Sequence, residues 1–105
     1  MKGFFVKEDF DLKGLEKYGF EPYIVKHYVG NKVTMSYEQY VKKFQEFGVK
    51  FVIRTDSKKL AIIDSMATSD DKEKMVLSLM KLIEDGVIVE KFYSFDDKGD
   101  IKWDK

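Results

Sequence analysis

The sequence has no cysteine and only one residue each of proline, histidine, arginine and tryptophan. The lack of cysteine excludes disulfide bonds, thiol nucleophiles and cysteine-ligated metal sites. A single histidine, His27, excludes the paired histidines of the common zinc motifs, and a lone strand histidine is typical of a structural or exposed role. We therefore expect no metal, no cofactor and no catalytic role for His27.

The chain also lacks net charge and long apolar runs. Its 19 basic residues balance its 19 acidic residues, which argues against nucleic acid as a partner because polyanion-binding proteins usually carry a net basic surface. The longest apolar runs are only a few residues, so we expect neither a signal peptide nor a membrane-spanning segment. Together with the absence of cysteine, this predicts a cytoplasmic protein.

Motifs of catalysis and phosphate binding are absent as well. None of the patterns G-x-S-x-G, G-x-x-x-x-G-K-[ST], G-x-G-x-x-G and H-E-x-x-H occurs, and the seven glycines are scattered singly. We therefore expect no enzyme and infer no small-molecule ligand. One enzymatic alternative stays open, in which paired carboxylates, Asp56 with Asp64 or Glu84 with Asp85, exchange protons after burial separates their pKa values.

What the sequence does contain is enough apolar material for one core. A chain of 105 residues, 44% apolar and 15% aromatic, has the length of a single domain and buries well over half of its unfolded surface. We expect one domain over residues 1–105.

Alternating apolar residues and turn signals predict strands over much of the chain. Gly30-Asn31 separates two β-rich runs at the spacing of a tight hairpin turn. The turn 55–59 separates a second pair of runs. The expected strands lie within residues 3–7, 23–35, 49–54, 60–64, 87–95 and 101–103.

Three segments have helical spacing and end at a glycine, namely residues 9–19, 36–48 and 70–86. The second has the strongest pattern, because Ser36 and Gln39 form a capping box and an apolar stripe follows at helical intervals. That stripe consists of Tyr37, Tyr40, Val41, Phe44 and Phe47. The three glycines would supply the left-handed conformation that ends a helix.

These elements predict the order β-α-ββ-α-ββ-α-β(β). Because most strands come as hairpins, we expect an α+β fold with a mostly antiparallel sheet and about three helices packed on one face.

The aromatic surplus is the feature left for function. Large side chains fill a small core economically, yet aromatic residues are also enriched at interfaces. The sole arginine, Arg54, fits an acidic partner or an ion pair with a nearby aspartate. The predicted interaction surface consists of Phe92, Tyr93, Phe95, Trp103 and Arg54.

The acidic tail 96–104 does not fit a calcium loop, because with Asp96 in the first position Lys98 takes the third, which such a loop gives to an acidic or amide ligand, and Gly99 takes the fourth, whereas the loop has its glycine at the sixth. A hairpin turn at Asp97-Lys98-Gly99 accounts for these residues.

The two ends of the chain carry a resemblance. "LEKYGFEPY" near the start and "LMKLIEDGVIVEKF" near the end resemble small uncharacterised proteins encoded by phages and prophages of Gram-positive bacteria. That resemblance implies no established activity and transfers no binding residue. It favours a small non-catalytic accessory protein that binds a protein partner or itself, as a homodimer.

An alternative is a winged-helix DNA-binding protein. Residues 69–103 resemble a recognition helix followed by the two strands of a wing. This alternative requires residues 57–66 to be helical, and it places Asp70, Asp71, Glu73, Glu84 and Asp85 on the helix that would face phosphates.

Overall fold

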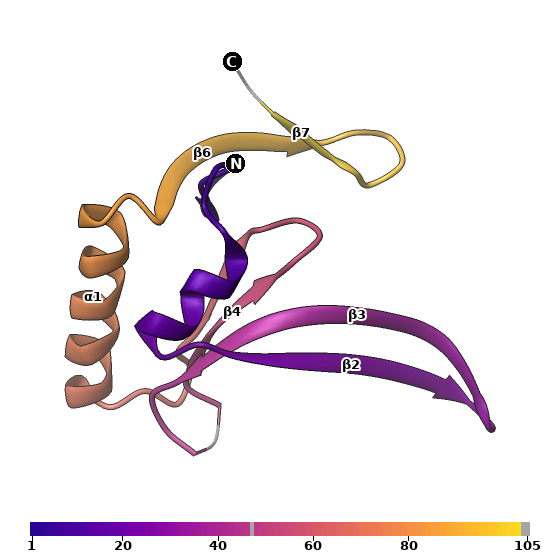
Figure 1. Cartoon of the computed structure of the whole chain (residues 1–105), viewed down its shortest axis with the longest axis horizontal. Helices are drawn as coiled ribbons and strands as arrows, with labels where there is room; N and C mark the ends of the chain where they lie inside the picture. Colours follow the sequence, from indigo (N-terminus) through magenta and orange to yellow (C-terminus); the bar gives the residue numbers. More distant parts are fainter. Residues whose placement is uncertain (47, 104–105) are drawn as a thin grey trace.

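The structure, a computed structural model, describes residues 1–46 and 48–103, and the side chain of Trp103 lies outside that description. Within these residues the chain forms a short 3-10 helix, one α-helix and seven strands (Figure 1). The helices are η1 (Leu12–Tyr18) and α1 (Ser69–Glu84). The strands are β1 (Lys2–Val6), β2 (Glu21–Val29), β3 (Lys32–Lys43), β4 (Lys50–Arg54), β5 (Leu60–Ile63), β6 (Ile88–Phe95) and β7 (Ile101–Trp103).

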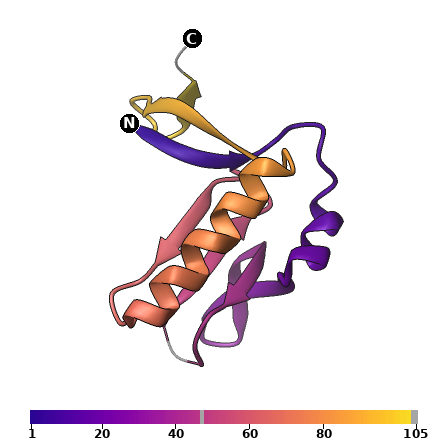
Figure 2. The same cartoon turned by 90° about the vertical axis from the view of Figure 1, so that its left-hand side faces the viewer.

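The strands form two antiparallel sheets, in the orders β1-β6-β7 and β2-β3-β4-β5. A single isolated bridge between Phe5 and Lys59 joins them, and the amide of Val6 donates to the carbonyl of Lys58 at 2.9 Å. Helix α1 packs over one face of the four-stranded sheet (Figure 2). The small sheet therefore continues from the edge of the larger one instead of stacking on it.

The expected antiparallel pairing is confirmed, but the prediction of three helices on one sheet face is wrong. Only one α-helix forms within the described residues, η1 is a 3-10 helix, and the segment predicted to be the best helix is strand β3. The predicted strands, the hairpin turn at Gly30-Asn31 and the turn after β6 are present.

Residues 36–43 belong to strand β3 although their apolar side chains have helical spacing. Met35, Tyr37 and Val41 lie on one face, and Tyr40 lies on the other. β-branched and aromatic side chains suit a pleated, half-buried surface. Pairing decides the outcome, since β2 binds β3 along its length and β4 binds its second half. The predicted capping box is wrong, because Ser36 pairs with Lys26, and Phe47 lies outside the described residues.

Helix α1 begins with a capping box that Thr68 and Asp71 form. The Thr68 hydroxyl accepts from the Asp71 amide at 3.2 Å, and the Asp71 carboxylate accepts from the Thr68 amide at 3.0 Å. The helix ends before Gly86, whose φ of 72° is left-handed as predicted. None of the helices in the described part of the chain is both long and apolar enough to cross a membrane.

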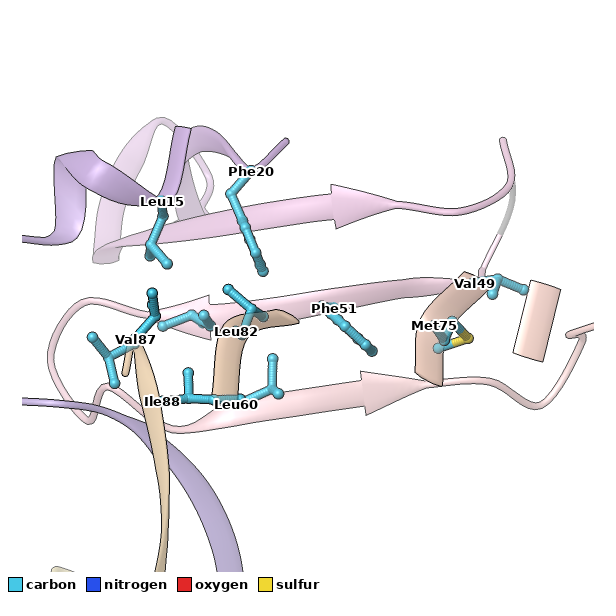
Figure 3. Close-up of a cluster of buried hydrophobic side chains, with 11 residues drawn as sticks. Leu15, Phe20, Val49, Phe51, Leu60, Met75, Leu82, Val87 and Ile88 are labelled. Carbon is cyan, nitrogen blue, oxygen red and sulfur yellow. The ribbon is translucent and has the colours of Figure 1, made fainter. Parts of the chain in front are cut away.

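The core lies between α1, η1 and the covered face of the larger sheet (Figure 3). Leu15 comes from η1, Phe51 and Ile53 from β4, and Met75 and Leu82 from α1, and each is buried. Side chains from the strand ends complete the cluster, namely Val6, Phe20, Val49, Leu60, Val87 and Ile88. Both helices and the strand segments next to them therefore contribute to one core, whereas the distant half of the β2–β3 hairpin does not.

That distant half forms an arm. Residues 24–29 pair only with residues 32–38 among the described residues, because β4 pairs with β3 only from Gln39 to Lys43. The arm extends away from α1 and the core (Figure 1). We call residues 24–37 the β2–β3 arm.

Two leucines of α1 provide a test of this core. Leu82 is fully buried, whereas the Leu77 side chain is 59% exposed. We expect Leu82→Ala to lower the free energy of unfolding by about 3–5 kcal/mol through lost transfer energy and a residual cavity. The control Leu77→Ala should cost less than about 0.5 kcal/mol. Urea unfolding followed by circular dichroism measures both, and equal losses would contradict the placement of α1.

Candidate functional site

The predicted interaction surface does not form one patch. Tyr93 is buried, 4% exposed, with its ring 5.5 Å from that of Phe5. Phe95 lies on the same face of β6, its ring 5.6 Å from that of Tyr93, and remains half exposed. Phe92 is also exposed but points to the opposite face, as strand alternation requires. Trp103 pairs with Tyr93 through its backbone.

Arg54 is committed to an intramolecular ion pair. Its Nε and Nη2 donate to the two carboxylate oxygens of Asp56 at 3.1 and 2.6 Å, and this pairing holds the pKa of Asp56 below its usual range. The guanidinium also lies over the Tyr37 ring, 4.0 Å from its centre. The predicted strand-end ion pair is confirmed. Arg54 and Phe95 line one shallow hollow of about 440 Å³, so two of the five predicted residues meet.

Other candidate sites resolve into structural roles. Residues 60–63, which a winged helix needs as a helix, are strand β5. The Asp96 carboxylate accepts from the amides of Lys98 and Asp100, each at 2.9 Å, and so closes the turn between β6 and β7. No group of three or more histidine or carboxylate side chains gathers at metal-binding distance in the part of the chain that the structure describes.

A different site appears where η1, β3 and α1 meet. A hollow of about 630 Å³ opens there between the three elements. We call it the lysine hollow, because four of its eight lining residues are lysines and none is acidic. Its walls consist of Lys17, Tyr18, Lys42, Phe44, Lys74, Leu77, Ser78 and Lys81.

Each wall of the lysine hollow is fixed by local structure. Lys74, Leu77, Ser78 and Lys81 recur at i, i+3, i+4 and i+7 on α1, so they share one helix face. Phe44 follows β3 and is held by its amide, which donates to the Val49 carbonyl at 2.8 Å.

Lys42 extends from β3 beneath the end of η1. Its Nζ donates to the Ser78 hydroxyl at 2.8 Å and lies 5.6 Å from the centre of the Phe44 ring. The chain makes room for it at Gly19, where φ is 89° and an added Cβ would lie 3.4 Å from Lys42 Cε. Burial lowers the pKa of Lys42 from its usual value, because the ammonium loses water.

One rim of the lysine hollow is closed by a chain of polar contacts. The Tyr18 hydroxyl donates to Asp85 Oδ2 at 2.8 Å, and Lys81 Nζ lies 3.3 Å from Asp85 Oδ1. The hydrogen bond from Tyr18, with Lys81 beside it, holds the pKa of Asp85 below its usual range and raises the pKa of Tyr18. Asp85 therefore ties η1 to the last turn of α1.

The β2–β3 arm is the second unusual surface. Its apolar side chains are exposed on both faces, because no third strand or helix covers them. The most exposed are Ile24, Tyr28, Val29, Val33 and Met35. Between Tyr23 and Tyr37 the chain carries Lys26 and Lys32 and no carboxylate.

Comparisons with protein-family models, with curated proteins and with solved structures find no match to this chain.

Neither the lysine hollow nor the exposure of the β2–β3 arm was predicted from the sequence. Lys74, Ser78 and Lys81 recur at helical spacing, so the face that they share on α1 could be predicted from the sequence. Lys42, however, lies in the segment 36–48 that was predicted to be a helix, and in the structure it belongs to strand β3. The arm was recognised as a hairpin, yet its exposure depends on where β4 stops pairing with β3.

The contact between Tyr18 and Asp85 has a testable pH dependence. A lowered folded-state pKa means that the contact stabilises the fold above the usual carboxyl pKa of about 3.9, and that this contribution is lost as pH falls through the folded value. We expect Tyr18→Phe to raise the pKa of Asp85, measured by NMR titration of its side-chain carboxyl. Tyr28→Phe, on the arm, is the control. An unchanged Asp85 titration in Tyr18→Phe would contradict the contact.

Proposed function

We propose that this chain is a small non-catalytic accessory protein, of the phage or prophage kind that its ends resemble, which acts by binding a second copy of itself. The β2–β3 arm is the binding element, and the outer face of α1 on the other copy receives it. The observation that carries this proposal is the amount of surface that the folded chain leaves uncovered.

The chain exposes more surface than its size requires. A compact monomer of 12.4 kDa exposes about 6,100 Å², whereas this chain exposes 7532 Å². The difference is about 1,400 Å², while a stable dimer buries about 800 Å² on each partner. The radius of gyration of 14.9 Å likewise exceeds the value of about 12.9 Å for a globular chain of this length. The arm, which extends away from the core, contributes to this departure from compactness (Figure 1).

An arm of this kind favours a covering partner on energetic grounds. An isolated two-stranded hairpin is marginally stable in water, and three or more strands or a packed helix are usually needed. Exposed apolar side chains on both faces gain about 25 cal/mol for each Å² that is removed from water. Association would therefore stabilise the arm as well as join two chains.

The outer face of α1 complements the arm in both apolarity and charge. Val76, Met80 and Ile83 form an exposed apolar stripe, with Glu73 and Glu84 along one side of it and Lys72 on the other. The arm offers apolar side chains, and its only charged residues are Lys26 and Lys32. The lysines of one copy would thus meet the glutamates of the other, an arrangement that guides association and fixes its orientation.

A second copy is needed for this contact, since the arm and α1 lie on opposite sides of the folded molecule (Figure 1). In two copies related by a two-fold axis, the arm of each copy would bind α1 of the other, which gives a closed dimer with the same contact made twice.

The test is the molecular mass in solution. We expect sedimentation equilibrium near physiological salt to give a concentration-dependent mass that approaches twice 12.4 kDa. The arm variant Ile24→Thr with Tyr28→Thr keeps strand propensity and removes apolar area from one face of β2. It should weaken dimerisation at least tenfold, and so should Met80→Gln on α1.

The matched control is Ile63→Thr, which removes an exposed isoleucine from β5, outside both surfaces. It should leave the dimerisation constant unchanged. A mass that stays at 12.4 kDa at all concentrations, or a dimer that both the arm and helix variants leave intact, would overturn the proposal.

A further inference from the structure

The lysine hollow concentrates charge of one sign in a chain whose net charge is zero. It brings together ammonium groups from η1, β3 and α1, three elements that are far apart in sequence. These ammonium groups line one shallow hollow, whereas scattered surface lysines would not share a lining.

The ion pairs around the hollow leave two of its lysines without an acidic partner. Lys74 lies 3.2 Å from Asp70 and Lys81 lies 3.3 Å from Asp85, both as exposed pairs one helical turn apart, which contribute little stability. Lys17 and Lys42 have no carboxylate within ion-pair distance among residues 1–46 and 48–103.

Lys42 is the more informative of the two. It is partly buried, and the partner of its ammonium is the neutral hydroxyl of Ser78. Partial burial of a charge without an opposite charge is costly, so such groups usually have a counterion. The Ser78 hydroxyl accepts from Lys42 and keeps its own proton free to donate into the hollow. An anion placed there would neutralise Lys42 and accept from Ser78.

The apolar part of the wall constrains the ligand further. The Phe44 ring, the exposed Leu77 side chain and Tyr18 line the hollow together with the lysines. Phe44 is held edge-on against Phe51, with ring centres 4.8 Å apart, so its position does not depend on a ligand. A flat apolar group could stack there, as bases do on aromatic side chains.

The volume and the charge of the lysine hollow limit the class of ligand that it can bind. A volume of about 630 Å³ is within the range of about 300–1,000 Å³ that is typical of small-molecule sites. Lys17 and Lys42 supply two ammonium groups without a carboxylate partner in the described part of the chain, which exceeds what one carboxylate requires, and lysine binds phosphate as a point charge without the planar geometry of arginine.

We propose that the lysine hollow binds a small organic phosphate that carries a flat apolar group, with the chemistry of a mononucleotide. Its phosphates contact Lys42, Lys17 and the Ser78 hydroxyl, with Lys74 and Lys81 at the rim, and its flat group lies on Phe44 and Leu77. The site is separate from the proposed dimer contact, because Lys74, Leu77, Ser78 and Lys81 lie on a different face of α1 from Val76, Met80 and Ile83.

The experiment is a calorimetric and NMR titration of the whole chain with three probes: adenosine diphosphate, adenosine and inorganic phosphate. Adenosine diphosphate should bind at least tenfold more tightly than either fragment, because it alone engages both the lysines and the apolar wall. Amide shifts should centre on residues 42–44 and 77–81. Affinity should fall as salt rises.

The matched variants exchange lysine for methionine, which keeps an unbranched side chain of nearly the same length and removes the charge. Lys42→Met should weaken binding of adenosine diphosphate at least tenfold, while Lys7→Met, at an exposed position outside the hollow, should not change it. Thermal unfolding of Lys42→Met should match the parent chain, since its loss removes an uncompensated, partly buried charge.

Three results would overturn this proposal. The first is no binding of adenosine diphosphate at millimolar concentration by the folded chain. The second is equal affinity for adenosine diphosphate and inorganic phosphate, which would leave the apolar wall without a role. The third is equal weakening by Lys42→Met and Lys7→Met, which would indicate attraction by overall charge. None of these depends on the oligomeric state, which sedimentation measures separately.

Discussion

The structure depends on strand β3 being held from both sides. Residues Gln39 to Val41 pair with β2 on one edge and with β4 on the other, at the centre of the four-stranded sheet, and Lys42 and Lys43 continue the pairing with β4. Val41 is buried there, and Tyr40 packs against the core from the covered face. Without this pairing, β4 and β5 would lose their link to β2, and α1 would have no continuous layer to cover.

Both candidate functional surfaces follow from the same strand. On the N-terminal side of Gln39, β3 no longer pairs with β4, and the rest of the β2–β3 hairpin forms the arm. Within the paired part, strand alternation directs Lys42 to the face that α1 covers, where it meets Ser78. A strand that is longer than its neighbour on one side thus produces an uncovered arm, and a lysine on its inner face produces an uncompensated charge.

Much of this arrangement could be predicted from the sequence. Turn residues and two-residue alternation located the strands, and the glycines at positions 19, 48 and 86 do adopt positive φ. Gly48, however, belongs to the connection between β3 and β4 and ends no helix. The misassigned segment 36–47 has apolar residues at helical spacing and no regular alternation. Such a segment is decided by its pairing partners, which lie elsewhere in the chain.

The functional surfaces were harder to predict for the same reason. The aromatic residues of β6 were recognised as interface candidates, but alternation buries Tyr93 and sends Phe92 and Phe95 to opposite faces. The balance of charge over the whole sequence also concealed its distribution. Exposure and charge clustering depend on which segments fold next to each other, and composition does not contain that information.

Backbone NMR of the segment 36–44 tests the central claim most directly. The account predicts cross-strand contacts between backbone protons of Tyr40 and Ile53 and of Val41 and Val52, together with slow amide exchange from Gln39 to Lys43. Sequential contacts three residues apart throughout this segment, with no cross-strand contacts to β4, would show a helix. They would contradict the sheet, the arm and the position of Lys42 together.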